Sequence, residues 1–84
     1  METRIALIGI IVENKESVKQ TNALLHEYGD YIVGRMGIPY YPKQVNIISI
    51  VLDAPENVIA ALSGKLGQIS GILVKSMMAK EPNA

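Results

Sequence analysis

Two segments of this chain carry apolar residues on both of their alternating rows. One is Arg4–Glu13, and the other is Val45–Leu52, where Asn46 and Ser49 are the exceptions. Such a pattern predicts strands that are covered on two faces. Runs rich in β-forming residues predict two further strands, over Tyr31–Gly37 and Ile69–Met78.

Two segments with helical spacing separate these strands. Asn14 is a suitable N-cap for a first helix that Gly29 ends, with an inner stripe formed by Val18, Thr21, Leu24, Leu25 and Tyr28. A second helix is predicted over Pro55–Leu66 with Asp53 as its cap. Pro55 fits this start because it lacks an amide hydrogen that the first turn would leave unpaired.

The elements follow the order strand, helix, strand, strand, helix, strand. This order predicts an α+β ferredoxin-like fold, βαββαβ, in which a four-stranded antiparallel sheet carries both helices on one face. The segment Ile38–Lys43 contains two prolines, which exclude pairing within a central strand, so we expect a stiff loop there. Residues 1–84 are expected to form a single domain, with residues 79–84 as a polar, frayed tail.

The second face of this sheet has no cover within the predicted elements. An 84-residue domain has a small core and this one has no cysteine for a disulfide, yet 49% of its residues are hydrophobic. A second face left in water would be a large apolar patch, which monomers avoid. We therefore expect a homo-oligomer, either a dimer or a tetramer, that buries this face or the sheet edges.

Charge and hydropathy argue against several partners. Eight basic and eight acidic residues cancel, and no cluster of Lys and Arg could follow a phosphate backbone, so we expect no direct contact with nucleic acid. The apolar run Ile5–Val12 is shorter than the ~20 residues of a membrane span, and the charged residues after it do not fit a signal cleavage site. These features predict a cytoplasmic protein with an intact N-terminus and no membrane association.

Side-chain chemistry indicates no catalytic site. Ser63, Ser70 and Ser76 lack a histidine partner at a plausible position, and no carboxylate pair stands out, so no enzymatic activity is expected. His26 is the only histidine, and a solvent-facing or capping role suits a lone imidazole better than metal ligation. We predict neither a metal nor a cofactor.

Three motifs carry a family resemblance: Ala61–Ile72 with the following Val74 and Lys75, Thr21–His26, and Arg35–Gly37. With these motifs, nearly the whole chain resembles the small bacterial proteins known as iron-only hydrogenase system regulators. The resemblance implies an ACT-like ferredoxin fold and a regulatory role that is named from association with that system, not from known chemistry.

A second resemblance rests on the spacing of His26, Asp30, Ile32 and Val33. It is similar to the pattern His-x-x-x-Asp-x-Ile-Val in the C-terminal, metal-sensing domain of the nickel-responsive repressor, and it implies the same fold and a tetrameric assembly. The positions of that family's other nickel ligands hold Gly37, Pro39 and Val45, which offer no side-chain ligand. The repressor's DNA-reading segment has no counterpart ahead of the first strand, so we expect any effect on transcription to pass through a protein partner.

The ACT-like resemblance also implies a place for an effector, because such domains bind ligands between subunits beside glycine-containing turns. The turn here runs from Gly67 to Gly71, where glycines also suit a left-handed helix end and a close backbone approach, so a structural role competes with binding. The candidate effector-binding or interface residues are Lys65, Gly67, Gln68, Ser70, Gly71, Tyr40, Tyr41 and His26.

Two classes of function remain open at this stage. In the first, the chain is an oligomeric regulatory module of the iron-only hydrogenase system that senses a small effector at a subunit interface. In the second, it is a protein-interaction or assembly factor for metalloenzyme maturation that binds no small ligand. A ligand that prefers the folded oligomer would raise its thermal midpoint, and this separates the two classes.

Overall fold

The elements of the fold appear in the predicted order. The computed structural model describes residues 2–80. Its strands are β1 (Arg4–Val12), β2 (Ile32–Tyr40), β3 (Val45–Ala54) and β4 (Ile72–Met78), and its helices are α1 (Glu16–Glu27) and α2 (Glu56–Gly67). Single 3₁₀ turns at Gly29–Tyr31 and Tyr41–Lys43 lie on either side of β2.

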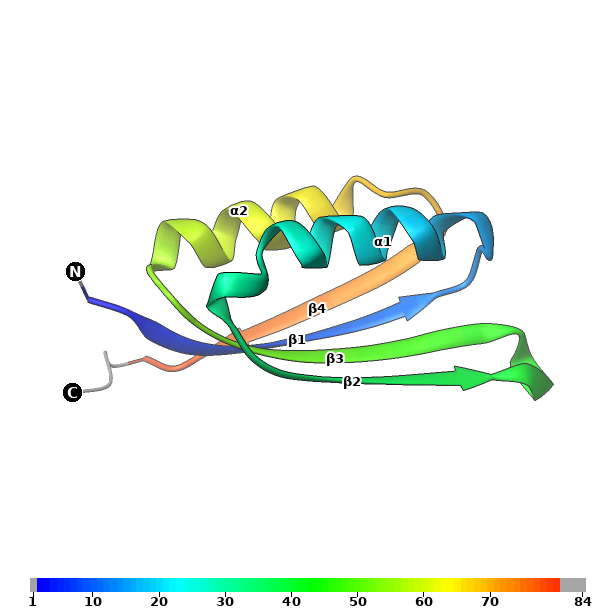
Figure 1. The fold of residues 1–84 in the computed structure, drawn as a ribbon, viewed down its shortest axis with the longest axis horizontal. Helices are drawn as coiled ribbons and strands as arrows, with labels where there is room; N and C mark the ends of the chain where they lie inside the picture. The colour runs from blue at the N-terminus through cyan, green and yellow to red at the C-terminus, as the bar shows by residue number, and fades with distance from the viewer. Residues whose placement is uncertain (1, 81–84) are drawn as a thin grey trace.

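The four strands form one antiparallel sheet in the order β2-β3-β1-β4. Both helices lie across the same face of this sheet, and the opposite face is left open (Figure 1). The predicted α+β ferredoxin-like arrangement, βαββαβ, is therefore confirmed.

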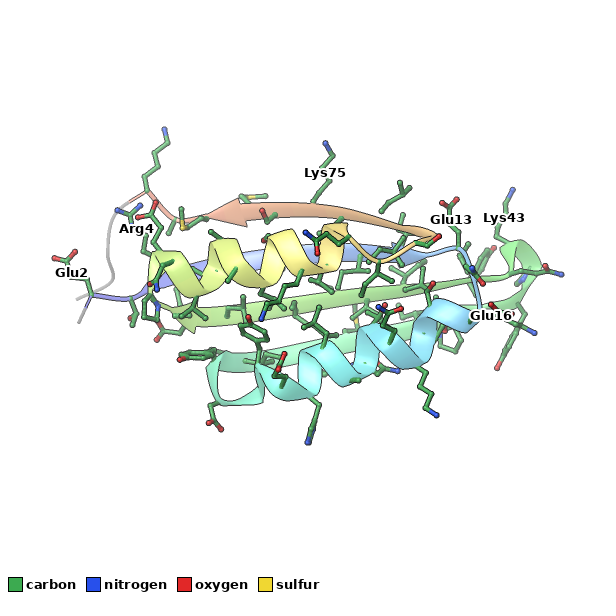
Figure 2. All side chains as sticks on the ribbon, turned by 90° about the horizontal axis from the view of Figure 1, so that it is seen from above. Glu2, Arg4, Glu13, Glu16, Lys43 and Lys75 are labelled. Carbon is green, nitrogen blue, oxygen red and sulfur yellow. The ribbon has the colours of Figure 1, made fainter. Side chains whose placement is uncertain are left out.

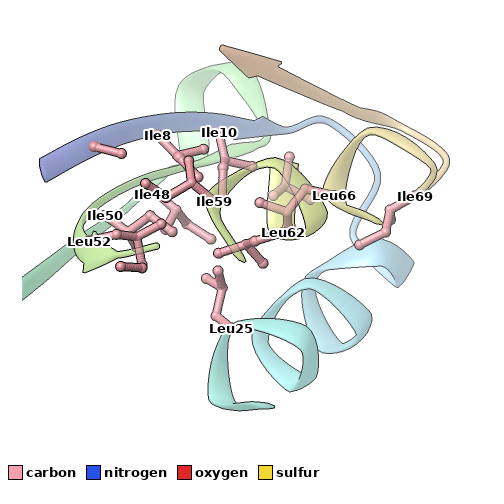
Figure 3. Close-up of a cluster of buried hydrophobic side chains, with 13 residues drawn as sticks. Ile8, Ile10, Leu25, Ile48, Ile50, Leu52, Ile59, Leu62, Leu66 and Ile69 are labelled. Atoms are coloured by element: carbon pink, nitrogen blue, oxygen red, sulfur yellow. The ribbon is translucent and has the colours of Figure 1, made fainter. Parts of the chain in front are cut away.

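The core lies between the sheet and the two helices. Alternate residues of the central strands point inward, so that Ile8 and Ile10 of β1 and Ile50 and Leu52 of β3 are almost fully buried. Leu62 and Leu66 of α2 and Leu25 of α1 close over them (Figure 3). Each such side chain contributes about 1.5–3 kcal/mol relative to exposure, which makes this cluster the main stabilising contact of the chain.

The prediction of a stiff loop over Ile38–Lys43 is wrong for its first half. β2 continues to Tyr40, and Pro39 lies opposite Asn46 of β3. The physical reason is that β2 is an edge strand, which pairs on one side only, so a proline nitrogen without a hydrogen can face away from the ladder. Only the Tyr41–Lys43 turn remains outside the strand, with Gln44 in a left-handed conformation at φ 54°.

The boundaries of the second half of the chain also differ from the prediction. Asp53 does not cap α2, because β3 extends to the buried Ala54 and Pro55 takes the N-cap position. β4 begins at Ile72 instead of Ile69, whose side chain is buried in the connection before the strand.

The connections β1–α1 and α2–β4 lie against each other. The Glu13 amide donates to the Gly71 carbonyl at 2.8 Å, and the Ser17 hydroxyl donates to the Ser70 carbonyl. The prediction of Asn14 as the N-cap of α1 is wrong by one residue: Lys15 holds that position without a side-chain cap hydrogen bond, and Asn14 Oδ1 accepts from the Glu16 amide at 3.0 Å.

The left-handed glycine of this region is Gly71, not Gly67. Gly67 is the last residue of α2, whereas Gly71 has a φ of 77° and faces Asn14 so closely that a Cβ there would lie 2.5 Å from the Asn14 Cβ. The predicted close approach at Gly71 is thus present, but it is made to a side chain as well as to a backbone.

The C-terminal end of the described chain is attached to β1. The Ala79 amide donates to the Ile5 carbonyl at 2.9 Å, and Arg4 Nη1 donates to the Ala79 carbonyl at 3.5 Å. The rest of the expected tail, residues 81–84, lies outside the described residues. Within residues 2–80, no helix has both the length and the apolar character needed to cross a membrane.

Replacement of Gly71 by alanine is expected to lower the free energy of unfolding by about 1–3 kcal/mol, because the left-handed φ and the contact with Asn14 both oppose a Cβ. The matched control is Gly67→Ala: this helical position has nothing within 4 Å, and the change should be neutral or stabilising by about 0.4–1 kcal/mol. Urea unfolding measures both. Equal effects of the two substitutions would contradict the assignment of the turn.

Candidate functional site

The face of the sheet that the helices leave uncovered is apolar; we call it the open face. The alternation of β1 and β3 that fills the core also directs a second set of large apolar side chains outward. The exposed fractions of these side chains lie between 37% for Ile47 and 69% for Met77, except that Val45 and Val51 are half-buried. The members on the four strands are Ile5, Leu7, Ile11, Met36, Ile38, Tyr40, Val45, Ile47, Val51, Leu73 and Met77.

Three rows of the open face cross all four strands, and the pairs Tyr40–Val45 and Ile5–Asp53 lie beyond them at the two ends of the sheet. One outer row consists of Gly34, Val51, Leu7 and Met77. The other outer row consists of Ile38, Ile47, Ile11 and Leu73. Between them lies a middle row with a different character, formed by Met36, Ser49, Gly9 and Lys75.

The middle row forms the floor of a hollow, because Gly9 and Ser49 are paired neighbours in the two central strands and both are small. The hollow has a volume of about 470 Å³ on the side of Ile11, Ile47 and Leu73. A smaller one, of about 250 Å³, lies on the side of Leu7 and Met77. Both share Gly9, Ser49 and Lys75, and we call them together the Gly9/Ser49 hollow.

The predicted effector residue Lys65 lies against α1. Its Nζ is 5.2 Å from the centre of the Tyr28 ring, and that ring is 6.5 Å from the ring of Tyr31. The Tyr28 side chain, by hydrogen bonding first and by its charge second, raises the pKa of Lys65 above its ordinary value. The Lys65 ammonium thus has an aromatic partner in its own chain.

The other predicted site residues are in separate parts of the fold. The Ser70 and Gly71 carbonyls accept hydrogen bonds from the β1–α1 side, and Gln68 is exposed after the last turn of α2. Tyr40 ends β2 and Tyr41, which is 80% exposed, follows it. Among residues 2–80, no hydrogen bond or ring contact joins either tyrosine to the Gly67–Gly71 turn.

His26 is exposed in the last turn of α1. Over the described residues, no three His, Cys, Asp or Glu side chains come together as a group that could hold a metal ion. The exposed His26 side chain agrees with the solvent-facing alternative of the prediction, and the last turn of α1 is where the helix dipole favours a cation.

Two of the sequence motifs are in contact. Arg35 Nη2 of β2 donates to Asn22 Oδ1 of α1 at 3.0 Å, which joins the Arg35–Gly37 motif to the Thr21–His26 motif. Sequence reasoning missed this pair and also missed Gly9 and Lys75. The available signal was the interruption of an apolar strand by a glycine, together with Ser49 as an exception in the other central strand.

Comparison with known proteins supports both predicted resemblances. A family model described as "TM1266-like: Iron-only hydrogenase system regulator, putative" matches residues 4–76. The solved structure of uncharacterized protein TM1266 from Thermotoga maritima is 40% identical with a TM-score of 0.89, covering 94% of this chain and 100% of that chain.

A curated relative, the "Putative nickel-responsive regulator" of Saccharolobus solfataricus, is 25% identical over 76 residues. These make up 90% of this chain but 56% of that protein, so the chain spans little more than half the length of this relative.

Two further solved structures show the fold alone. The C-terminal domain of MgtC from Mycobacterium tuberculosis is 12% identical with a TM-score of 0.72, covering 99% of this chain and 95% of that one. A formyltetrahydrofolate deformylase from Pseudomonas putida KT2440 is 11% identical with a TM-score of 0.71, covering 92% of this chain and 29% of that one.

We predict that tag-free protein binds nickel and zinc only below stoichiometric amounts, because a lone imidazole with oxygen neighbours does not match the nitrogen and thiolate sets that hold these ions. Elemental analysis after exposure to each metal and desalting measures this. His26→Ala serves as the control and should retain as little metal as the parent. One equivalent of nickel or zinc per chain would refute the prediction, and its loss in His26→Ala would identify His26 as a ligand.

Proposed function

This chain belongs to the TM1266-like family of iron-only hydrogenase system regulators, and we propose that it acts as a self-associating regulatory module whose subunit interface responds to a small effector. The family description supports the regulatory part of this proposal. The open face supports the self-association, and it is the single observation that carries the proposal.

The open face resembles a protein interior more than a surface. Its two outer rows are apolar across the full width of the sheet, and Ile47 and Ile11 stand directly opposite each other on the two central strands. Burial of apolar area contributes roughly 25 cal/mol per Å², and contiguous apolar patches of this kind mark interaction surfaces. A face that the fold itself leaves open therefore favours a partner.

A second copy of the chain fits this face, because in a two-fold dimer the same patch is used twice. Two apolar rows lie on either side of a mixed row that has the small residues Gly9 and Ser49 at its centre. When one sheet is turned over onto the other, this middle row lies on the middle row of the second copy. Sheets that pack face to face lie about 10 Å apart and interdigitate their apolar side chains, as these rows can do.

Regulation through such an interface follows from mass action. A small molecule that binds only the associated form stabilises it, and its concentration then sets how much of the protein is assembled. The signal passed on would be the assembly state, and the receiver would be a protein partner, as expected from the absence of a cluster of basic residues in the sequence.

Ile47→Glu is expected to dissociate the assembly, because it puts a charge at the centre of an apolar row on a central strand. The parent should give at least twice the chain mass of 9.1 kDa by light scattering at micromolar concentration, and the variant should give about that mass. Gln20→Glu on the outer side of α1 adds the same charge and should leave the assembly intact.

A monomeric parent would contradict self-association. It would then favour a different protein as the cover of the open face, which is the assembly-factor function. The same preparations also test for an effector by thermal shift with amino acids, nucleotides and metals. Loss of a ligand-induced shift in Lys65→Ala and Gln68→Ala would place the effector beside the Gly67–Gly71 turn.

A further inference from the structure

The glycine at position 9 is not required by the fold. Gly9 lies in the middle of the central strand β1, and among the described glycines only Gly71 has a positive φ. The nearest atom to a Cβ built on Gly9 is the Lys75 carbonyl oxygen at 4.0 Å, which is ordinary contact. Glycine within a strand costs roughly 0.5–1 kcal/mol relative to alanine. Neither the backbone conformation nor the packing within the chain therefore requires a glycine at position 9.

The space above Gly9 has the size and lining of a small-molecule site. Its larger part, about 470 Å³, lies within the range of about 300–1,000 Å³ that is usual for such sites. Ile11, Ile47 and Leu73 form apolar walls around it, and the Ser49 side chain adds a hydroxyl at the floor. An occupant with a short hydrocarbon body fits this lining.

One charge lies at the border of the hollow. Of the residues that form the three rows, Lys75 alone is charged, and it lines both parts of the hollow. In Figure 2, its side chain extends outward beyond the β4 edge of the sheet. A lysine commonly keeps its methylene groups along an apolar surface and its ammonium in water, so an anionic group at the rim can reach the ammonium without being desolvated.

We propose that the Gly9/Ser49 hollow binds an aliphatic carboxylate, with the hydrocarbon over Gly9 and the carboxylate at the Lys75 ammonium. This inference rests on the proposed function, because the second copy completes the site. A two-fold contact centred on the open face stacks the middle row on the middle row, so Gly9 and Ser49 meet small residues of the partner. Small side chains that face small side chains leave a void between the two copies. An unfilled void weakens an interface because dispersion contacts are lost there. A hydrocarbon that fills the void strengthens association, and this gives the effector its control over assembly.

Hexanoate is a suitable probe, and hexanol and hexylamine test the role of its charge. In a titration followed by ¹H–¹⁵N correlation spectra, hexanoate should shift the amide signals of Gly9, Ser49 and Lys75 most strongly. It should bind about two- to fivefold more tightly than hexanol, as an ion pair that stays in contact with water predicts. Hexylamine should bind more weakly still. Equal affinities for hexanoate and hexanol would overturn the assignment of a carboxylate.

Lys75→Met keeps most of the side chain and removes the charge, so the affinity for hexanoate should fall about two- to fivefold while the affinity for hexanol stays the same. The matched control is Lys19→Met on the exposed side of α1, which should bind hexanoate like the parent. An unchanged affinity in Lys75→Met would overturn the role of Lys75.

Gly9→Val fills the hollow with a β-branched residue that suits a strand, and outside its neighbours in sequence the nearest atom to the new Cβ is the Lys75 carbonyl oxygen at 4.0 Å. The variant should remain folded and associated by light scattering and lose the response to hexanoate. Dissociation of Gly9→Val to monomers would show that the partner's side chain fills the hollow, and would overturn the proposal. Loss of binding in Gln68→Ala with normal binding in Gly9→Val would overturn it in favour of the Gly67–Gly71 turn.

The outcomes separate this proposal from the proposed function. An associated parent whose Gly9, Ser49 and Lys75 amides do not respond to hexanoate overturns the ligand site and leaves self-association standing. A parent that is monomeric with and without hexanoate overturns both self-association and the shared site.

Discussion

The antiparallel pairing of β1 with β3 is the constraint on which the rest of this structure depends. One register places Ile8 and Ile10 beside Ile50 and Ile48 under the helices. The same register places Ile11 beside Ile47 on the other face, because side chains alternate along a strand. A shift by one residue would exchange the two faces, so the core and the open face are specified together and neither can change alone.

The helices depend on this pair of strands through a second set of contacts at one end of the sheet. Asn14 and Ser17 from the start of α1 meet Ser70 and Gly71 after α2, so both helices are tied at the end where β1 finishes and β4 begins. At the other end Arg4 Nη2 lies 3.8 Å from Glu56 Oε2 at the start of α2, and this pair of a half-buried and an exposed side chain contributes little to stability. The glycine-spaced motif thus has a structural use that accounts for Gly71 without any ligand.

Periodicity was sufficient to predict the fold, because each element satisfies its own repeat and the order of elements admits few topologies. Periodicity failed where the end of a strand or helix depends on the elements that pack beside it. Pro39 is acceptable only because β2 is at an edge, and Asp53 stays in β3 only because Ala54 is buried. Of the candidate site, the apolar second face was predictable, whereas the grouping of Gly9, Ser49 and Lys75 was not, since three strands distant in sequence meet there through a register that pattern alone does not specify.

Gly9 lies in a central strand of a small domain, where glycine is destabilising, and the fold does not explain its presence there. At Gly71 the cost is offset by a backbone conformation that other residues resist, and a Cβ would collide with Asn14. At Gly9 neither reason applies, and the lost side chain would have pointed to the open face, not to the core. The two glycines therefore have different roles. Gly71 is needed for the stability of the monomer, whereas Gly9 is explained by a molecule that contacts the open face. This contrast is why the open face, and not the glycine turn, is the stronger candidate for the regulatory site.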